Sequence, residues 1–212
     1  MQIDILVYDG NDELDVVGPF EVFRLAGELV KVRSRLVTLR PQNRVKGSHG
    51  LKFKPDAYLL DEGQGAKKLA KRKNWPDVIV VPGGGWNNPG ANQGARLQVK
   101  LGDVPAFLTI ARRSVDTLAS VCTGAMLLAE AGVIGKRAAT THASAMADLA
   151  ETGAEVRSDR VVDDGDLITS GGVTSGIDLA LWLLEREFGR RIADGLAAVL
   201  EYQRWRPGGT QP

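Results

Sequence analysis

Short apolar runs alternate with helical patterns from one end of this sequence to the other. Residues 3–8 and 77–81 are rich in β-branched and aliphatic side chains, which is typical of strands buried on both faces. Residues 15–29 instead repeat apolar side chains at the spacing of a helix that buries one side. Because strands separated by helices are joined by crossover connections, this alternation predicts a doubly wound, mostly parallel sheet with helices on both faces.

The same patterns predict the remaining elements, with no linker or internal repeat between them. Strands are expected at residues 30–39, 116–121, 137–141, 154–157, 160–162 and 167–170, a hairpin at 45–53, and helices at 97–113, 123–131, 144–152, 175–188 and 190–202. Gly102 and Pro105 are expected to interrupt the helical pattern of residues 97–113. We therefore expect residues 1–212 to form one domain.

Charge and cysteine content narrow the possible partners. Lys and Arg total 27 and Asp and Glu 26, so the net charge of +1 gives no reason to expect a nucleic acid or a membrane surface as partner. The lysine-rich stretch 63–74 has no interleaved aromatic residue, which favours a solvated surface connection over a nucleic-acid site. A single cysteine excludes an internal disulfide and a cysteine-rich zinc site. Without a secretion signal or a run of about 20 apolar residues, the chain is expected to be soluble and cytoplasmic.

The single cysteine, Cys122, lies where a β-prone run stops and a helical pattern begins. Ser120 and Gly124 place small residues two positions before and after it, as a nucleophile elbow requires because the chain folds back on itself there. The N-terminus of the following helix favours a thiolate, so the pKa of Cys122 is expected to lie below that of a free cysteine. A buried structural cysteine is the alternative, and the small flanking residues favour a catalytic or redox-active thiol.

Other candidate residues follow or lie near the ends of predicted strands, where sites are found in open parallel sheets. Gly84 and Gly85 belong to a glycine triplet that can bring backbone N–H groups close to a ligand, as in an oxyanion hole. Asp15 lies at a helix start, where it serves either in chemistry or only as a cap. His142 fits a core or surface position as well as a catalytic one, and His49 has no identifiable partner. These residues suggest no metal site.

Taken in order, several segments resemble the ThiJ/PfpI superfamily of class I glutamine amidotransferase-like proteins. They are residues 13–19 (ELDVVGP), 80–85 (VVPGGG), 119–124 (ASVCTG), 140–142 (TTH) and 171–178 (GGVTSGID). The Leu-Asp-x-x-Gly-Pro, Cys-Thr-Gly and Thr-Thr-His motifs are most similar to the isocyanide hydratase branch. The resemblance implies a flavodoxin-like fold, with residues 1–212 forming a single ThiJ/PfpI-like domain.

By this resemblance Cys122 is the nucleophile and Asp15 is the neighbouring carboxyl group that exchanges protons with the substrate. Thr123 is implied to steady the thiolate and supply a backbone donor, and Gly84 and Gly85 to contribute oxyanion or substrate-binding donors. Thr123 stands where the intracellular protease branch has a histidine, which argues against peptidase activity. His142 stands where other branches keep a histidine near the thiol, so it is retained as a possible site residue.

These residues favour an enzyme, a lyase (hydratase) or a hydrolase, whose Cys122 attacks a small electrophilic molecule. The resemblance implies hydration of an isocyanide to an N-substituted formamide, with no cofactor and no metal. Two alternatives stay open: a redox or stress sensor in which Cys122 is oxidised beside Asp15, and a glyoxalase, deglycase, amidase or protease-type activity that uses the same thiol. The resemblance also implies a homodimer, and the charge balance predicts no nucleic-acid or membrane partner.

Overall fold

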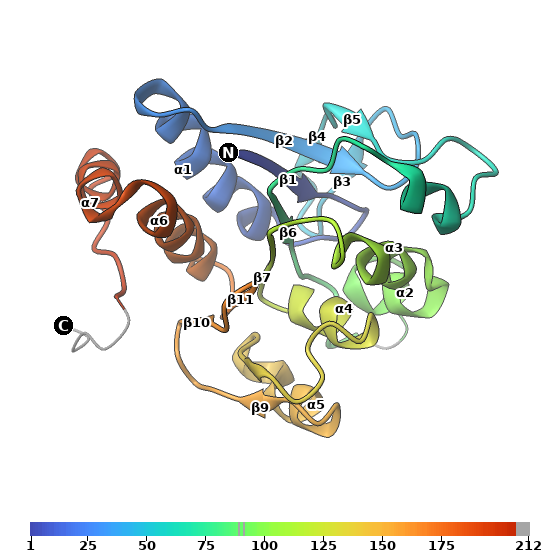
Figure 1. Cartoon of the computed structure of the whole chain (residues 1–212). Helices are drawn as coiled ribbons and strands as arrows, with labels where there is room; N and C mark the ends of the chain where they lie inside the picture. The colour runs from blue at the N-terminus through green and yellow to red at the C-terminus, as the bar shows by residue number, and fades with distance from the viewer. Residues whose placement is uncertain (89, 91, 207–212) are drawn as a thin grey trace.

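A seven-stranded sheet forms the centre of the computed structural model, which describes residues 1–88, 90 and 92–206. Its strands, in spatial order, are β10 (Val161–Asp163), β11 (Leu167–Ser170), β7 (Thr117–Val121), β6 (Val78–Val81), β1 (Gln2–Leu6), β2 (Arg33–Thr38) and β5 (Ala57–Tyr58) (Figure 1). Every neighbouring pair is parallel except β10 and β11. The predicted flavodoxin-like, mostly parallel sheet is therefore confirmed.

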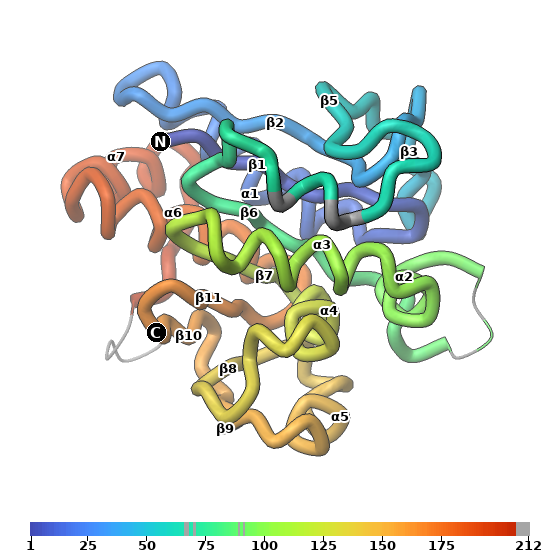
Figure 2. The backbone as a smooth tube through the Cα atoms, turned by 45° about the vertical axis from the view of Figure 1, so that its right-hand side comes forward, coloured from blue at the N-terminus to red at the C-terminus, as the bar shows by residue number. Residues whose placement is uncertain are grey.

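Helices cover both faces of the sheet (Figures 1 and 2). One face carries α1 (Glu13–Leu29), α6 (Ser175–Phe188) and α7 (Arg190–Val199), and the other carries α2 (Ala95–Leu101), α3 (Asp103–Ala111), α4 (Gly124–Glu130) and α5 (Met146–Glu151). Two 3₁₀ helices, η1 (Ala66–Lys71) and η2 (Ala143–Ala145), and two small sheets, β3 (Val45–Lys46) with β4 (Lys52–Phe53) and β8 (Ala138–Ala139) with β9 (Glu155–Val156), complete the described elements.

The side-chain alternation of the strands divides the core into two layers. Ile3 and Ile5 of β1 face the layer that contains Phe23 of α1, whereas Leu6 faces the layer that contains Phe107 of α3. All these side chains are almost completely buried. Because successive strand residues point to opposite faces, a strand covered by helices on both sides must be apolar at nearly every position. This explains the continuous apolar runs in the sequence.

The predicted elements are present, with small differences at their ends. Gly102 separates α2 from α3 at a φ of 77°, as expected from the interruption of the pattern over residues 97–113. The strand expected at residues 30–39 begins only at Arg33, because the Val30 N–H caps α1 at the Ala26 carbonyl (2.9 Å) and the Val32 N–H turns back to the Val30 carbonyl (2.8 Å). None of the helices in the described part of the chain combines the length and the apolar character needed to cross a membrane.

Candidate active site

The single cysteine lies on a tight turn between β7, which ends at Val121, and α4, which begins at Gly124. Cys122 has a φ of 58°, and its side chain is 6% exposed. Its N–H donates to the carbonyl oxygens of Ser170 (3.1 Å) and Gly171 (2.8 Å). A positive φ is unfavourable for residues other than glycine and is found preferentially at functional sites. This geometry fits a nucleophile elbow.

The structure gives a physical reason for the small residues around the elbow. A Cβ atom added at Gly124 would lie 2.0 Å from the carbonyl oxygen of Val81, so the backbones of α4 and β6 approach too closely for any side chain. Ser120 is completely buried, and its carbonyl oxygen accepts a hydrogen bond from the Ser170 hydroxyl (3.1 Å). A larger residue at either position would have to displace the neighbouring strand.

Asp15 lies in the first turn of α1 and is completely buried. Its Oδ2 atom accepts a hydrogen bond from the N–H of Gly83 (2.9 Å). Its Oδ1 atom has no hydrogen-bond partner in the part of the chain that the structure describes. The cap of α1 is Asp12, whose side chain accepts from the N–H of Leu14 (3.0 Å). The explanation that Asp15 only caps a helix is therefore wrong.

The surroundings of Asp15 favour its protonated form. Burial and the nearby Asp12 carboxylate raise the pKa of Asp15 to about 8, although the Gly83 N–H, the Cys122 thiol and the Val173 N–H all lower it. The Cys122 thiol and the Val173 N–H thus belong to the same site as Asp15. Near neutral pH Asp15 is a carboxylic acid, which can both donate and accept a proton.

The thiol is also held in its protonated form. Burial and the Asp15 carboxylate raise the pKa of Cys122 to about 12, and the N–H groups of Thr123 and Val173 only partly oppose this. The expectation of a pKa below that of a free cysteine is therefore wrong: the predicted donors are present, but burial outweighs them and no cation acts on the sulfur within the described chain. Because Cys122 and Asp15 interact, the two groups titrate as a coupled pair.

A strained backbone position supplies one of the shared donors. Val173, in the turn that leads into α6, has a φ of 51°. A β-branched residue rarely adopts such a conformation. In this conformation, the Val173 N–H lowers the pKa of both Cys122 and Asp15. The motif at residues 171–178 supports the resemblance to the family, but the sequence alone predicts no role for Val173.

The glycine loop after β6 packs directly against the elbow. The Gly84 N–H donates to the Thr123 hydroxyl (2.9 Å), so this predicted substrate donor has a partner within the protein. Gly84 and Gly85 have φ values of 110° and 68°, which glycine adopts without strain. A Cβ at Gly85 would lie 3.0 Å from the Cα of Gly94. Donation by Gly84 and Gly85 to a bound oxyanion remains a prediction.

His142 lies beside the elbow without a direct hydrogen bond to the thiol among the described residues. Its Nδ1 atom accepts from the Ser144 N–H (3.1 Å) and lies 2.7 Å from the Ser144 hydroxyl. The ring packs against Gly172, where an added Cβ would lie 2.2 Å from the imidazole Cδ2. The preceding Thr141 hydroxyl donates to the Cys122 carbonyl (2.9 Å). His142 thus packs against the loop next to the elbow, and its catalytic role stays a prediction.

His49 does have a partner, contrary to what the sequence suggested. Its Nδ1 atom lies 2.8 Å from Glu13 Oε2, and Glu13 also accepts from the N–H groups of His49 (2.6 Å) and Leu51 (3.2 Å). Burial alone would raise the pKa of Glu13, but hydrogen bonds led by that of the His49 side chain lower it to about 2. With Asp12, these groups place potential metal ligands within 4.8 Å of one another. Glu13 is already engaged in holding the β3–β4 hairpin.

Comparison with known proteins identifies relatives over nearly the whole chain. The profile of the DJ-1/PfpI family matches residues 1–186. An isonitrile hydratase from Pseudomonas putida is 34% identical over 204 residues, which are 95% of this chain and 78% of that protein. The HTH-type transcriptional regulator GbdR from Pseudomonas aeruginosa is 29% identical over 96% of this chain, which spans only 51% of that regulator.

Solved structures share the fold. A ThiJ/PfpI family protein from Pseudomonas syringae superimposes with a TM-score of 0.78 at 27% identity, covering 97% of this chain and 76% of the other. DJ-1 from Schizosaccharomyces pombe superimposes with a TM-score of 0.75 over 96% of this chain and 100% of the other. At 22% identity, the second comparison supports the fold alone.

Proposed function

Because the chain belongs to the DJ-1/PfpI family, we propose that it is an enzyme that hydrates small isocyanides to N-substituted formamides, with Cys122 as nucleophile and Asp15 as proton carrier. The observation that supports this most directly is the strained, buried turn at Cys122 beside the completely buried carboxyl group of Asp15, whose pKa burial raises to about 8. Cys122 retains 6% exposure, whereas Asp15 has none.

The protonation state of the pair matches what an isocyanide requires. The terminal carbon of an isocyanide takes up both a proton and a nucleophile. Asp15 gives its proton to that carbon while the Cys122 sulfur forms the C–S bond, and the thiol proton passes to the Asp15 carboxylate. The product of this step is a thioimidate, and Asp15 is again a carboxylic acid. The unpaired Oδ1 atom of Asp15 is available for these transfers.

Water completes the reaction without any further reagent. A water molecule adds to the thioimidate carbon, Asp15 protonates the nitrogen, and the water proton returns to Asp15. The C–S bond then breaks, the hydroxyl proton passes to the sulfur through Asp15, and an N-substituted formamide leaves. The sum is one isocyanide and one water giving one formamide, with Cys122 and Asp15 restored. The Thr123 and Val173 N–H groups stabilise negative charge on the sulfur during both transfers.

The test is turnover of simple alkyl and aryl isocyanides, followed by the formyl proton in ¹H NMR spectra. In H₂¹⁸O the formamide must carry the label, because its oxygen comes from water. Turnover should fall as the pH rises through about 8, where Asp15 loses its proton. Absence of formamide with every isocyanide tried would refute the substrate class.

The competing functions have their own outcomes in the same experiment. Methylglyoxal consumption without isocyanide turnover would favour a glyoxalase or deglycase, and amide hydrolysis would favour an amidase or protease-type hydrolase. Formation of a Cys122 sulfenate or sulfinate at low peroxide concentration, with no turnover, would favour a redox sensor. The raised pKa of Cys122 gives the sensor less support, because oxidation proceeds through the thiolate.

We further propose that the chain is a single cytoplasmic domain that pairs as a homodimer. The support is an apolar surface formed by Leu14 and Val17 of α1, each 37% exposed, and Leu51, 50% exposed. The Leu51 N–H donates to Glu13, which brings the Leu51 backbone to the start of α1. Light scattering should give twice the monomer mass, and Val17→Glu should halve it. Val199→Glu, at a 68% exposed position of α7, is the control that should leave it unchanged.

A further inference from the structure

Tyr8 is a buried titratable residue that the proposed reaction does not use. It lies two residues after the end of β1 and is 5% exposed. Its hydroxyl donates to the carbonyl oxygen of Pro82 (2.5 Å) and lies 3.5 Å from that of Gly83. Burying a hydroxyl is unfavourable unless it forms a hydrogen bond, and a phenylalanine would fill the same space without that requirement. The position of the hydroxyl therefore needs an explanation.

The carbonyl that accepts from Tyr8 belongs to the same peptide group as the N–H that binds Asp15. The Pro82 carbonyl and the Gly83 N–H are the two ends of one planar unit. At one end the Tyr8 hydroxyl donates to the oxygen (2.5 Å), and at the other the N–H donates to Asp15 Oδ2 (2.9 Å). Fixing the direction of the carbonyl therefore fixes the direction of the N–H.

We propose that Tyr8 is a positioning residue, whose hydroxyl holds the Pro82–Gly83 peptide with its N–H directed at Asp15 and strengthens that donor. A hydrogen bond to a peptide oxygen polarises the peptide group and makes its N–H a better donor, by roughly 10–30% in the condensed phase. Without the hydroxyl, the Pro82 oxygen would be buried and unpaired, and the glycine that follows would let the peptide rotate.

The Gly83 N–H is important because few groups near Asp15 stabilise its carboxylate form. The titratable neighbours are Asp12 in the same turn, Cys122 on the elbow and Tyr8 itself, and none of them is a cation. Besides the thiol, only the backbone donors of Gly83 and Val173 lower the pKa of Asp15. Burial, Asp15 and Cys122 raise the pKa of Tyr8 well above its ordinary value, so its hydroxyl stays protonated and donates throughout the working pH range.

The proposal rests on the proposed role of Asp15, but its test needs no substrate. Protein labelled with ¹³C at the aspartate carboxyl carbons is titrated by NMR, and the Asp15 signal is assigned with Asp15→Asn. We expect Tyr8→Phe to raise the pKa of Asp15 by about half a pH unit to one pH unit, since a carboxylate loses part of its hydrogen bonding. Tyr8→3-fluorotyrosine, a stronger donor of the same shape, should lower it.

Tyr202→Phe is the matched control. The Tyr202 hydroxyl donates to the buried carboxylate of Asp178 (2.7 Å) and not to a peptide group that binds Asp15, so its loss should leave the Asp15 titration unchanged. An unchanged Asp15 pKa in Tyr8→Phe, with the thermal unfolding temperature lowered or not, would overturn the proposal and leave Tyr8 a packing residue. Opposite shifts in the two Tyr8 variants would support it even if no isocyanide is turned over, because a purely structural hydroxyl would not produce them.

Discussion

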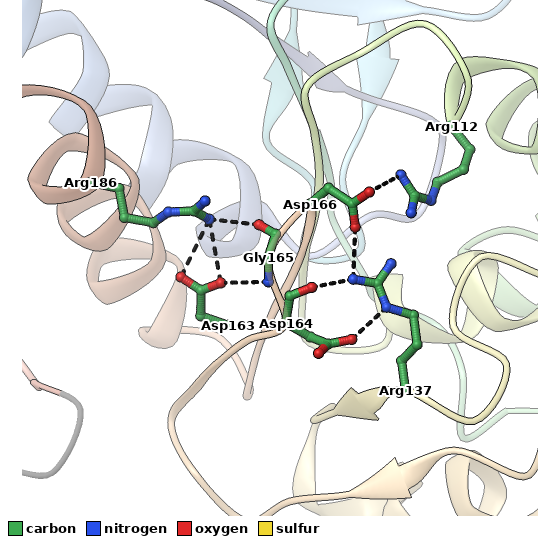
Figure 3. A network of polar contacts seen from close by, with 7 residues as sticks. All are labelled: Arg112, Arg137, Asp163, Asp164, Gly165, Asp166 and Arg186. Carbon is green, nitrogen blue, oxygen red and sulfur yellow. Dashed lines mark hydrogen bonds and ion pairs between the residues drawn. The ribbon is translucent and has the colours of Figure 1, made fainter.

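At the amino end of strand β11, the turn at residues 163–166 carries three carboxylates that all pair with arginines. At the carboxyl end, the Ser170 carbonyl accepts from the Cys122 N–H, and the neighbouring Asp15 meets no cation among the residues that the structure describes. Figure 3 shows the first of these regions. Arg137 pairs with Asp164 (2.5 Å) and Asp166 (2.7 Å). The two regions are built on the same sheet and use the same acidic residue type.

The arginines reach the turn from different elements. Arg112, which follows α3, pairs with Asp166 (2.5 Å), and Arg186 of α6 donates to the Gly165 carbonyl (2.8 Å) and pairs with Asp163 (3.3 Å) (Figure 3). The turn therefore ties together helices on both faces of the sheet. Its side chains are partly exposed, so solvent weakens each pair.

Two aspartates summarise the difference between the regions. Partial burial alone would raise the pKa of Asp166, but hydrogen bonds from Arg112 and Arg137 lower it. Burial raises the pKa of Asp15 to about 8, and no arginine of the described chain opposes this. The pairs with arginine thus keep Asp166 charged, and this charge stabilises the fold. Asp15 has no such pair, so it keeps a proton that it can transfer near neutral pH.

Replacing the thiol should have the largest effect. Cys122→Ser is expected to reduce isocyanide turnover by roughly 10³-fold or more, because a hydroxyl is far less nucleophilic and no histidine base is bonded to it. Steady-state kinetics and circular dichroism are the measurements, and the fold should survive. Turnover within a factor of about ten of wild type would contradict the role of Cys122 as nucleophile.

Replacing one aspartate at each end tests the comparison directly. Asp15→Asn should lower kcat by roughly 10²–10⁴-fold because it removes the transferable proton. Asp166→Asn is the control and should leave kcat unchanged. Asp15→Asn should also lower the pKa of Cys122, measured by iodoacetamide alkylation, since the Asp15 charge raises it in the wild type. Equal kcat values for Asp15→Asn and wild type would require another route for the proton.

The two aspartates should also give opposite dependences of stability on pH. The folded pKa of Asp15 is raised to about 8, so its unfavourable contribution is absent below the unfolded value near 3.9, grows as the pH rises, and is complete above about 8. The folded pKa of Asp166 is lowered, so its contribution is present above that unfolded value and is lost as the pH falls. Urea unfolding of wild type, Asp15→Asn and Asp166→Asn between pH 3 and pH 9 separates the two slopes.

Glycines at the two ends should respond differently to a methyl group. Gly124→Ala would place its Cβ 2.0 Å from the Val81 oxygen, so we expect a loss of about 3 kcal/mol or more and collapse of the elbow. Gly165→Ala meets open space and only the strain of a φ of 80°, which costs about 1 kcal/mol. Chemical denaturation measures both. Similar losses would mean that the elbow tolerates movement of β6.

Removing the shared arginine at the amino end should have a moderate effect on stability alone. Arg137→Ala breaks the pairs with Asp164 and Asp166, and we expect a loss of about 1–2 kcal/mol after allowing for their exposure. The loss should shrink in high salt and at low pH, where the carboxylates are protonated. Urea unfolding in low and high salt tests this, and kcat should not change. A drop in kcat would show that the two ends of the sheet are coupled.

The smallest effect is expected from the most exposed arginine of the network. Arg186→Met should cost about 0.5 kcal/mol, because Arg186 is 36% exposed and Asp163 keeps a hydrogen bond from the Trp182 indole (2.7 Å). The measurement is the shift in the urea midpoint relative to Arg137→Ala. A larger loss than that of Arg137→Ala would mean that Arg186 contributes more to stability than Arg137.

The sequence by itself determined the order of the elements and the position of the elbow. Apolar runs alternating with helical patterns specify a parallel sheet, because each strand must be buried on both faces. The small residues Ser120 and Gly124 identify the turn at Cys122 because the steric requirement is local to five residues. These features depend on residues that are close in the chain, so the sequence alone is enough to predict them.

The tertiary structure alone decided the protonation of the site and the partners that control it. Asp12 rather than Asp15 caps α1, and Glu13 rather than solvent binds His49. The Asp15 carboxyl meets a donor 68 residues away, at Gly83, and the Tyr8 hydroxyl meets Pro82. Backbone N–H groups have no signature in a sequence, and burial is a property of the whole packed chain. For this reason the helix N-terminus predicted a thiolate, whereas the buried environment raises the pKa of both Cys122 and Asp15.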